Sequence, residues 1–372
     1  MDKKNKNPNV PNLRFTNNQL KDFKIVDICK LKQGNQYDLK QQFTEEKLDL
    51  KRFIRIIDYT QKTNDIRYVY SNGSENYVDC TDVVVVRYGA SAGYVGRGIN
   101  GIIANNLFTI RPINSALLNK SYLYHYLNAP VIQKQLNNTQ SSGMPALNFQ
   151  TINNLHILLP EYQEQRQIAV FLDKIDERIQ TQIKIIDSYF SLSKAISNTL
   201  IGQSKGNTRL RECLNCYSSN TMESVIKQED LGDYPVYGAN GIIKKINNYE
   251  IEYPSIAIVK DGSGVGKMFK LSGKYSILST LNYLTSKPGY DIDYIYYALK
   301  QKSLKKYVVG SGIPHIYFKD YEQEKIYIPQ NELQQQNITS VLQSIDEEIG
   351  NEIKQLKNYE LLKKYLLKNM FV

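Results

Sequence analysis

The sequence lacks features that whole classes of protein require. No apolar run approaches the roughly 18 residues needed to cross a membrane, and the first ten residues carry no apolar stretch of the kind found in signal peptides. The 4 cysteines are too few and too irregularly spaced for a disulfide framework in a chain of 372 residues. We therefore expect a cytoplasmic protein that does not interact with membranes.

Signatures of several enzyme classes are also missing. None of the 11 prolines precedes another proline, so the N-P-P-[YF] motif with which amino-methyltransferases grip a flipped adenine is absent. No proline is followed by Asp, which argues against a common nuclease pattern. The 3 histidines, His125, His156 and His315, do not cluster. We therefore predict no catalytic residue.

Two short stretches match ligand sites only in part. DGSGVGKM at 261–268 has Asp261 where a phosphate-binding P-loop needs its first Gly and Met268 where it needs Ser or Thr, so a turn or a backbone contact to phosphate is the better interpretation. Cys213 and Cys216 have metal-ligand spacing, but no second pair lies nearby, which favours buried apolar thiols over zinc. We predict no metal site.

The chain contains an internal duplication. SGMPALNF at 142–149 and SGIPHIYF at 311–318 share the pattern S-G-x-P-x-x-x-F, and each is followed by a proline and a long stretch with matching apolar positions. Upstream, the tyrosines of 122–126 match those of 294–297, and the glycine-rich segment 87–93 resembles 260–266. The period far exceeds the roughly 20–50 residues of solenoid repeats, so we predict two complete domains.

A long amphipathic helix is predicted at the end of each copy. Residues 161–201 contain no Pro or Gly, repeat apolar residues at spacings of 3 and 4, and stop at Gly202. The stretch from 330 to the end repeats the pattern, with Gly350 as a weak point. Because a lone helix cannot bury such a stripe, we expect the two helices to pack together as an antiparallel coiled coil.

The predicted fold class is α+β, with two tandem mixed α/β domains, each followed by its long helix. The tyrosines of 122–126 and 294–297 could stack on bases, but their helical spacing favours the core. Our division of the chain has five parts: a polar tail (1–12), the first domain (13–159), the first helix with its linker (160–205), the second domain (206–328) and the second helix (329–372).

Basic charge is concentrated in the two domains. Of the net charge of +10, residues 161–205 and 330–372 contribute 0 and −1, so the rest of the chain carries +11. Solvated lysines would explain this charge, but basic residues interleaved with Tyr, Asn and Gln also suit phosphates and base edges. Two such domains on a rigid spacer would address half-sites about one helical turn, roughly 34 Å, apart, which favours DNA.

The order of these motifs resembles the DNA-specificity subunits of type I restriction-modification systems. The basic domain, the YLYHYLNAP-type helix, the S-G-x-P-x-x-x-F pattern and LPEYQEQRQIAVFLDKIDERI follow one another in both copies, from Leu13 to the C-terminus. The segments 51–58 and 234–241 also resemble elements found inside the family's target-recognition domains.

By this resemblance, residues 13–159 and 206–328 are target-recognition domains that read the two halves of a bipartite site in double-stranded DNA. The helices would dock two methylation subunits, which use S-adenosylmethionine to methylate adenine, and added restriction subunits would use ATP and Mg²⁺ to cut unmodified DNA. The chain itself would bind no cofactor and catalyse nothing, in the cytoplasm of a prokaryote. The family's Glu-Gln pair matches Glu164-Gln165 and becomes Leu333-Gln334 in the second copy.

Candidate contact residues follow from the chemistry of base recognition and from the resemblance. Arg and Lys suit guanine, and Asn and Gln suit adenine. The predicted DNA-binding residues are Arg52, Arg55, Arg67, Arg87, Arg97, Tyr237, Asn240, Lys244, Lys245, Lys260 and Lys267. The predicted partner-docking residues are Glu164, Gln165, Ile168, Leu172, Ile338 and Leu342.

Two other functions stay open on the sequence alone. A coiled-coil interaction scaffold without sequence-specific DNA binding would fit the near-neutral helices, although it leaves the basic domains without a purpose. An enzyme with an unrecognised site in one domain is the second alternative.

Overall fold

The computed structural model describes residues 11–16, 18–61, 63–137, 145–226 and 232–371. The chain forms two compact units, of which the first comprises Met1–Ile183 and Lys354–Val372 and the second Lys184–Ile353. Each unit therefore holds one domain together with part of both long helices. None of the described helices has the length and apolar composition that crossing a membrane demands.

The first domain is built on two four-stranded sheets, ordered β2-β9-β6-β7 and β4-β3-β8-β5, with β1 and β10 paired separately. Neighbouring strands are antiparallel except for β3 and β8, which run parallel. The strands are β1 (Lys21–Lys24), β2 (Cys29–Gln33), β3 (Leu50–Ile54), β4 (Arg67–Tyr70), β5 (Tyr77–Val78), β6 (Val83–Val86), β7 (Val95–Gly96), β8 (Gly101–Ile103), β9 (Leu107–Pro112) and β10 (His156–Leu159). The helices are α1 (Ile25–Ile28), the 3-10 turn η1 (Leu39–Gln41), α2 (Ile56–Thr60), α3 (Lys120–Leu127), α4 (Pro130–Leu136) and α5 (Phe149–Asn153).

The second domain repeats this plan. Its sheets are ordered β12-β18-β15-β16 and β14-β13-β17, and its β11 and β19 pair separately. Among the described strands of this domain, β13 and β17 run parallel. The strands are β11 (Thr208–Arg209), β12 (Leu214–Ser218), β13 (Tyr234–Gly238), β14 (Gly241–Ile246), β15 (Ser255–Val259), β16 (Met268–Leu271), β17 (Ser276–Ile277), β18 (Leu281–Ser286) and β19 (Lys325–Ile326). The helices are α7 (Leu210–Cys213), η3 (Glu223–Val225), α8 (Ile292–Lys300), η4 (Leu304–Tyr307) and α9 (Phe318–Tyr321).

An inner strand that is apolar on both faces lies at the centre of each domain. In β6, Val83 and Val85 face the core beneath the helices, whereas Val84 and Val86 face a second core that also contains Ile54 and Ile103 of the neighbouring sheet. In β15 the residues alternate in the same way between two cores. Because successive side chains of a strand point to opposite faces, an unbroken run of β-branched residues fits only such a doubly covered strand.

The tyrosine segments lie in the core, as predicted. Tyr122 and Tyr126 of α3 and Tyr294 and Tyr297 of α8 are buried. The Tyr122 hydroxyl donates to the carbonyl of Leu158 (3.1 Å), and the Tyr294 hydroxyl donates in the same way to Tyr327 (3.0 Å). The two helices are thus equivalent in packing as well as in sequence.

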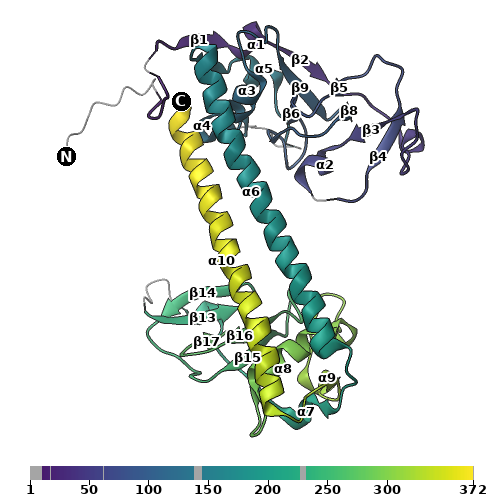
Figure 1. The fold of residues 1–372 in the computed structure, drawn as a ribbon, viewed down its shortest axis with the longest axis vertical. Helices are drawn as coiled ribbons and strands as arrows, with labels where there is room; N and C mark the ends of the chain where they lie inside the picture. Colours follow the sequence, from purple (N-terminus) through teal and green to yellow (C-terminus); the bar gives the residue numbers. More distant parts are fainter. Residues whose placement is uncertain (1–10, 17, 62, 138–144, 227–231, 372) are drawn as a thin grey trace, which may run out of the picture. The chain divides into compact units, whose positions relative to one another are not determined.

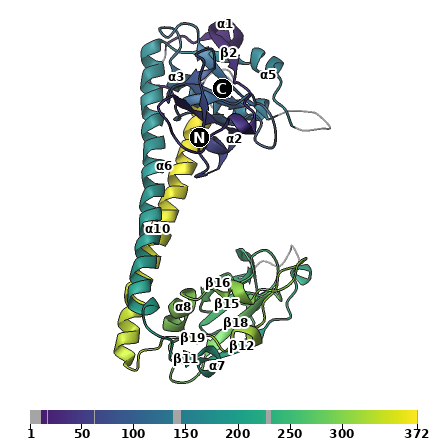
Figure 2. The same cartoon turned by 90° about the vertical axis from the view of Figure 1, so that its right-hand side faces the viewer.

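Each domain is followed by its long helix, α6 (Tyr162–Ser197) with the π-helical turn η2 (Asn198–Gly202), and α10 (Glu332–Met370). In the first unit the two helices lie side by side and antiparallel (Figure 1, Figure 2). Asp176 of α6 pairs with Lys363 of α10, and Gln182 of α6 accepts a hydrogen bond from Gln355 of α10. In the second unit Ile196 and η2 Ile201 pack in one core with α10. The predicted antiparallel helix pair is confirmed, and Gly350 lies within α10 without interrupting it.

The end of α10 completes the core of the first unit. Phe371 is buried against the rings of Tyr122 and Tyr126, with centroids 5.3 and 6.2 Å away. The backbone N–H of Leu13 donates to the carbonyl of Asn369 at 2.9 Å. The chain therefore returns to its own N-terminal segment at the end of the second helix.

Glu164 fastens that N-terminal segment to the start of α6. Its side chain is 1% exposed and accepts hydrogen bonds from the Arg14 guanidinium (2.7 Å), from the Thr16 hydroxyl and from the N–H groups of Phe15 and Thr16. Burial alone would raise the pKa of Glu164, but these donors outweigh it and hold the pKa below its usual range. The carboxylate is therefore charged and fully partnered in the folded first unit.

Replacing Glu164 by Ala is expected to lower the free energy of unfolding of the first unit by about 3 kcal/mol at pH 7, because Arg14 loses its buried partner. A carboxyl whose pKa is lowered by folding stabilises the fold above its unfolded pKa of about 4.3, and this stabilisation is lost as the pH falls. Urea unfolding at pH 7 and pH 3.5 measures both effects. The exposed Glu161, replaced by Ala, is the matched control and should stay within about 0.5 kcal/mol of wild type. An equal loss in both variants would contradict this role of Glu164.

Candidate nucleic-acid interface

A glycine loop with the same backbone geometry occurs in both domains, between β6 and β7 and between β15 and β16. In the first domain Gly89 and Gly93 have φ angles of 89° and 88°, and in the second Gly262 and Gly266 have 92° and 83°. Side chains with a Cβ rarely adopt this region, so glycine is required at these positions. The loop of 261–268 therefore joins two antiparallel strands and does not lead into a helix, which excludes a P-loop.

The S-G-x-P-x-x-x-F segment binds to this loop through its backbone. In the first domain the Gly89 N–H donates to the carbonyl of Pro145 (2.9 Å) and the Leu147 N–H to that of Arg87 (2.8 Å). The second domain repeats both bonds between Gly262 and Pro314 and between Ile316 and Lys260, each at 2.9 Å. Residues 142–144 of the first copy lie outside the described residues. Two motifs that are separate in the sequence thus form one junction in each domain.

Arg87 and Lys260 occupy equivalent positions at these junctions. The Arg87 guanidinium lies 4.7 Å from the ring centroid of Tyr88 and 4.3 Å from that of Phe149, and it donates to the side-chain oxygen of Gln33 at 2.9 Å. Phe149 is the last residue of the first S-G-x-P-x-x-x-F copy, so this motif positions the arginine directly. Lys260 is partly exposed. The junction therefore presents a cation in both domains, one of them held by aromatic rings.

A second group of predicted residues gathers around β3 and β4. Arg52 and Arg55 pair with Asp58, which is 1% exposed in its side chain, while Arg55 and Arg67 pair with Asp65. Hydrogen bonds from Arg67 and Arg55 lower the pKa of Asp65, so this carboxylate is charged at neutral pH. Three arginines face two carboxylates, so one positive charge is in excess. The arginine side chains are 19 to 33% exposed.

Beside this group lies a concave surface of about 750 Å³. Three basic residues outnumber the single acidic one among the described residues of its lining, which are Glu46, Lys47, Leu48, Leu50, Lys51, Arg52, Tyr68, Tyr77 and Asn100. Lys47 and Lys51 are not among the predicted DNA-binding residues, although the spacing K-x-x-x-K-R at the start of β3 is a usable signal. Basic, aromatic and amide side chains on one concave face are suited to a nucleic-acid strand.

The second domain places its predicted residues on the equivalent sheet. Lys244 and Lys245 lie on β14, opposite Val236 and Pro235 of β13, and Asn240 is exposed in the turn between these strands. Tyr237 packs edge-on against Tyr275 (centroids 6.0 Å apart), and burial raises its pKa. Lys267 of the glycine loop is exposed, 5.1 Å from the Phe269 ring centroid. The predicted residues of both domains thus lie in two equivalent regions. One is the second sheet of each domain (β4-β3-β8-β5 and β14-β13-β17), and the other is the glycine loop. Arg97 is the exception.

Arg97 lies at the joint between the first domain and the helices. Its guanidinium pairs with Asp173 (2.5 Å) and Asp176 (3.5 Å) of α6 and covers the ring of Tyr124 at 3.8 Å. His125 Nε2 lies 2.8 Å from the Asp173 carboxylate, and burial lowers the pKa of this histidine. These contacts give Arg97 a role in holding the domain on α6.

His125, Asp173 and Asp176 are close enough together to be considered as metal ligands. However, Asp173 is already neutralised by Arg97, and Asp176 pairs with Lys363 of α10 at 2.5 Å. Burial would raise the pKa of Asp173, but hydrogen bonds from His125, Arg97 and Ser121 hold it well below its usual range. The cluster therefore joins α3, α6 and α10 in the first unit and offers a cation little net charge.

The cysteine pair is also poorly suited to a metal. Cys213 is buried, and its Sγ lies 3.5 Å from the carbonyl oxygen of Leu210. Burial raises the pKa of the Cys213 thiol to about 12 and that of Cys216 to about 11. Since zinc binds the thiolate, thiols that stay protonated at neutral pH favour the apolar interpretation.

The predicted docking residues contact their own chain. Ile168 and Leu172 belong to the core of the first unit, and Ile338 and Leu342 to the main core of the second. Glu164 binds the N-terminal segment, and Gln165 binds the backbone of Leu117, Asn119 and Pro160. All six side chains are buried, so they hold each helix on its own domain.

The alignment of the Glu-Gln pair with Leu333-Gln334 needs correction. Gln165 Nε2 donates to the carbonyl of Pro160 (3.0 Å), and Gln335 Nε2 donates in the same way to Pro329 (2.8 Å). The inserted residue of the second copy therefore lies before this glutamine, and the equivalent pair is Gln334-Gln335. Leu333 is exposed and makes no such contact.

Apolar side chains remain exposed near the start of both helices. Phe15, Val170 and Phe171 line a groove of about 470 Å³ on α6 in the first unit, with Arg166 and Lys174 at its edges. On α10 in the second unit, Leu333 and Val341 are exposed. These residues are not among the predicted docking residues. The run IAVFL at 168–172 is a signal for them, because five consecutive apolar residues cover more than one face of a helix.

Comparisons with known proteins agree with this duplicated architecture. A curated relative, the specificity subunit of the type I restriction enzyme MjaVIII of Methanocaldococcus jannaschii, is 34% identical over 169 residues, which is 42% of this chain and 39% of the relative. The S subunit of a type I restriction-modification system from M. genitalium has the same fold, with a TM-score of 0.69, 19% identity and coverage of 98% of this chain and 99% of the other. A second structure, described in terms of complex assembly and conformational transition of the type I R-M system, has a TM-score of 0.52, 14% identity and coverage of 95% and 97%.

The family model of the type I restriction modification DNA specificity domain matches residues 17–187 and again 208–358. These two matches cover most of the chain and coincide with the two copies of the fold described above. The chain therefore belongs to the type I restriction modification DNA specificity domain family and contains two tandem copies of that domain.

Proposed function

We propose that this chain is the DNA-specificity subunit of a type I restriction-modification complex, with one half of a bipartite DNA site bound by each domain. The observation that carries this proposal is the glycine-loop junction, which has the same backbone hydrogen bonds in both domains but different side chains. One scaffold used twice with different surfaces is what reading two unlike half-sites requires.

Charge supports the same function. The net charge of +11 outside the two helical segments supplies the sequence-independent attraction to phosphates. The partly exposed arginines of β3 and β4 and the lysines of β14 supply groups that can contact base edges. A scaffold function without a DNA partner does not account for the positive charge on the two domains. In our proposal the chain binds no cofactor and performs no chemistry, while partner subunits use S-adenosylmethionine, ATP and Mg²⁺.

We further propose that methylation subunits dock on the exposed apolar faces at the starts of α6 and α10. Phe15 and Phe171 form an edge-on aromatic pair with centroids 6.0 Å apart, and Val170 is 55% exposed beside them. The second unit offers Leu333 and Val341 near the start of its own helix. Two related faces suit two copies of one partner.

Mapping of N6-methyladenine tests the recognition function. The chain should be co-expressed with the methylation subunit encoded beside it, and the host genome then sequenced by a single-molecule method that detects the modified base. We expect one split motif with a fixed gap, methylated on both strands. A stable complex that leaves the DNA unmethylated and shows no salt-dependent DNA binding would favour the scaffold function instead.

Substitution of Val170 by Asp tests the docking face. Because Val170 is exposed, the free energy of unfolding should stay within about 0.5 kcal/mol of wild type. A charge in a buried apolar interface is costly, so co-purification of the methylation subunit should fall at least about tenfold. Gln180→Asp, which introduces the same charge at an exposed polar position of α6, is the control and should assemble normally. Normal assembly of both variants would place the docking face elsewhere.

A further inference from the structure

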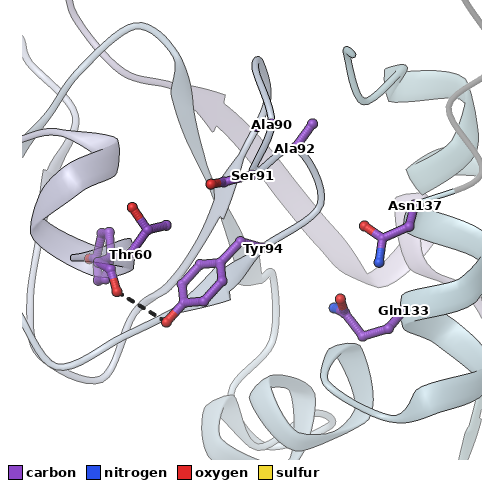
Figure 3. A pocket seen from close by; sticks show the side chains of 8 residues that line it. Thr60, Ala90, Ser91, Ala92, Tyr94, Gln133 and Asn137 are labelled. Carbon is purple, nitrogen blue, oxygen red and sulfur yellow. Dashed lines mark hydrogen bonds between the residues drawn. The ribbon is translucent and has the colours of Figure 1, made fainter. Parts of the chain in front are cut away.

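A cavity of about 360 Å³ lies beside the glycine loop of the first domain. Figure 3 shows α4 side chains facing the loop across this cavity. Six of its lining residues come from three elements: Tyr59 and Thr60 of α2, Ser91 and Tyr94 of the loop, Gln133 of α4 and Asn137 at its C-terminal end. Hydroxyl and amide groups predominate in this lining, and none of the described residues that line it is charged. We call it the amide cavity.

The walls of the amide cavity are fixed by hydrogen bonds. The Tyr94 hydroxyl donates to the carbonyl of Tyr59 (3.2 Å), and Gln133 Nε2 donates to the carbonyls of Leu127 (2.7 Å) and Gly93 (3.4 Å). Gly93 has a φ of 88°, and a Cβ built there would lie 2.5 Å from the side-chain oxygen of Asn137. The loop and α4 are therefore in close contact at Gly93, which any larger residue would disturb.

Two polar groups of the amide cavity remain available to a ligand. Asn137 is exposed, and its side-chain amide makes no hydrogen bond to the described part of the chain. Gln133 uses its Nε2 internally, which leaves its Oε1 as an acceptor. A donor and acceptor pair at Asn137 with a further acceptor beside it is suited to the edge of a base.

The second domain keeps the backbone of the glycine loop but changes its side chains. The carbonyls of Tyr94 and Lys267 accept from Val86 and Val259 at 2.9 Å each, so these loop positions are equivalent. By the same correspondence Ser91 becomes Gly264, whereas the segment after α8 forms the 3-10 turn η4 in place of a helix like α4. Tyr94 of the cavity thus stands against the exposed Lys267 of the second domain. The same loop backbone with different side chains indicates that the two domains have different binding roles at this position.

We propose that the amide cavity is a base-reading site of the first domain, at which Asn137, supported by Gln133, contacts an adenine edge in the major groove. The proposal rests on the DNA-specificity function above. Asn and Gln present an acceptor and a donor that match N6 and N7 of adenine, a pattern that the other bases do not offer there. The described lining residues carry no charge and add little phosphate attraction, so they contribute to selectivity and not to general affinity.

Replacement of Asn137 by Ala in the assembled complex tests this assignment. Binding should be compared for duplexes that carry the mapped site and single base-pair changes at each specified position. We expect one A·T position of a single half-site to lose roughly 5- to 150-fold in discrimination, as for loss of one bidentate contact. The other half-site should keep its full specificity, and the N6-methyladenine map should show the same single relaxed position.

Gln135→Ala is the matched control, because Gln135 is an exposed amide of α4 that does not line the cavity, and it should leave every position unchanged. If Asn137→Ala recognises the same DNA site as the wild type, the amide-cavity proposal is wrong. Methylation of a split motif by the wild-type complex would still support the wider DNA-specificity function. A uniform loss on all sequences with a smaller salt dependence would make Asn137 a backbone contact and would also overturn it. Absence of salt-dependent DNA binding by the wild-type complex would refute both.

Discussion

The burial of one apolar stripe on each long helix is the constraint on which the rest of the structure depends. A helix of this length with an apolar side is not stable alone in water, so it must pack against other elements. The core of the first unit contains Leu367 of α10 and Phe371, the residue after it. The core of the second unit contains Ile201 of η2, with Ile196 of α6 packed against it. Each core is therefore completed by the helix of the other repeat, which ties the two copies into one molecule.

This shared core separates two kinds of position in the domains. Positions that hold the backbone are the same in both copies: left-handed glycines, the Pro145 and Pro314 carbonyls that accept from them, and tyrosines that donate to a backbone carbonyl shortly before each long helix. Positions that face outward from the glycine loop differ, such as Tyr94 and Lys267. A fixed framework with variable outward side chains lets recognition change without loss of stability.

The repeat, the helices and the glycine loops could be predicted from the sequence because each depends on local residues, such as a glycine with positive φ or a 3- and 4-residue apolar spacing. The roles of charged and buried residues could not, because they depend on which residues meet in space. Arg97 looked like any other basic residue, yet two carboxylates from α6 surround it. Glu164 matched a family pair, but only the fold brings Arg14 to it. Val170 lay in an apolar run whose inner and outer faces cannot be assigned before the core is known.

The acidic residues of α6 near the first domain are paired with cations, which reduces the repulsion between this helix and a polyanion. Asp173 is matched by Arg97, Asp176 by Lys363 and Glu164 by Arg14, so the acidic residues of α6 near the first domain are neutralised within the unit. The cations in these pairs are not available to DNA, although they count in the net charge. Attraction to phosphate therefore depends on exposed cations such as Lys51, Lys245 and Lys267, which lie on the second sheets and on a glycine loop. Because the ion pairs that hold the domain on α6 are neutral, the excess positive charge lies on the surfaces where we propose that DNA is recognised.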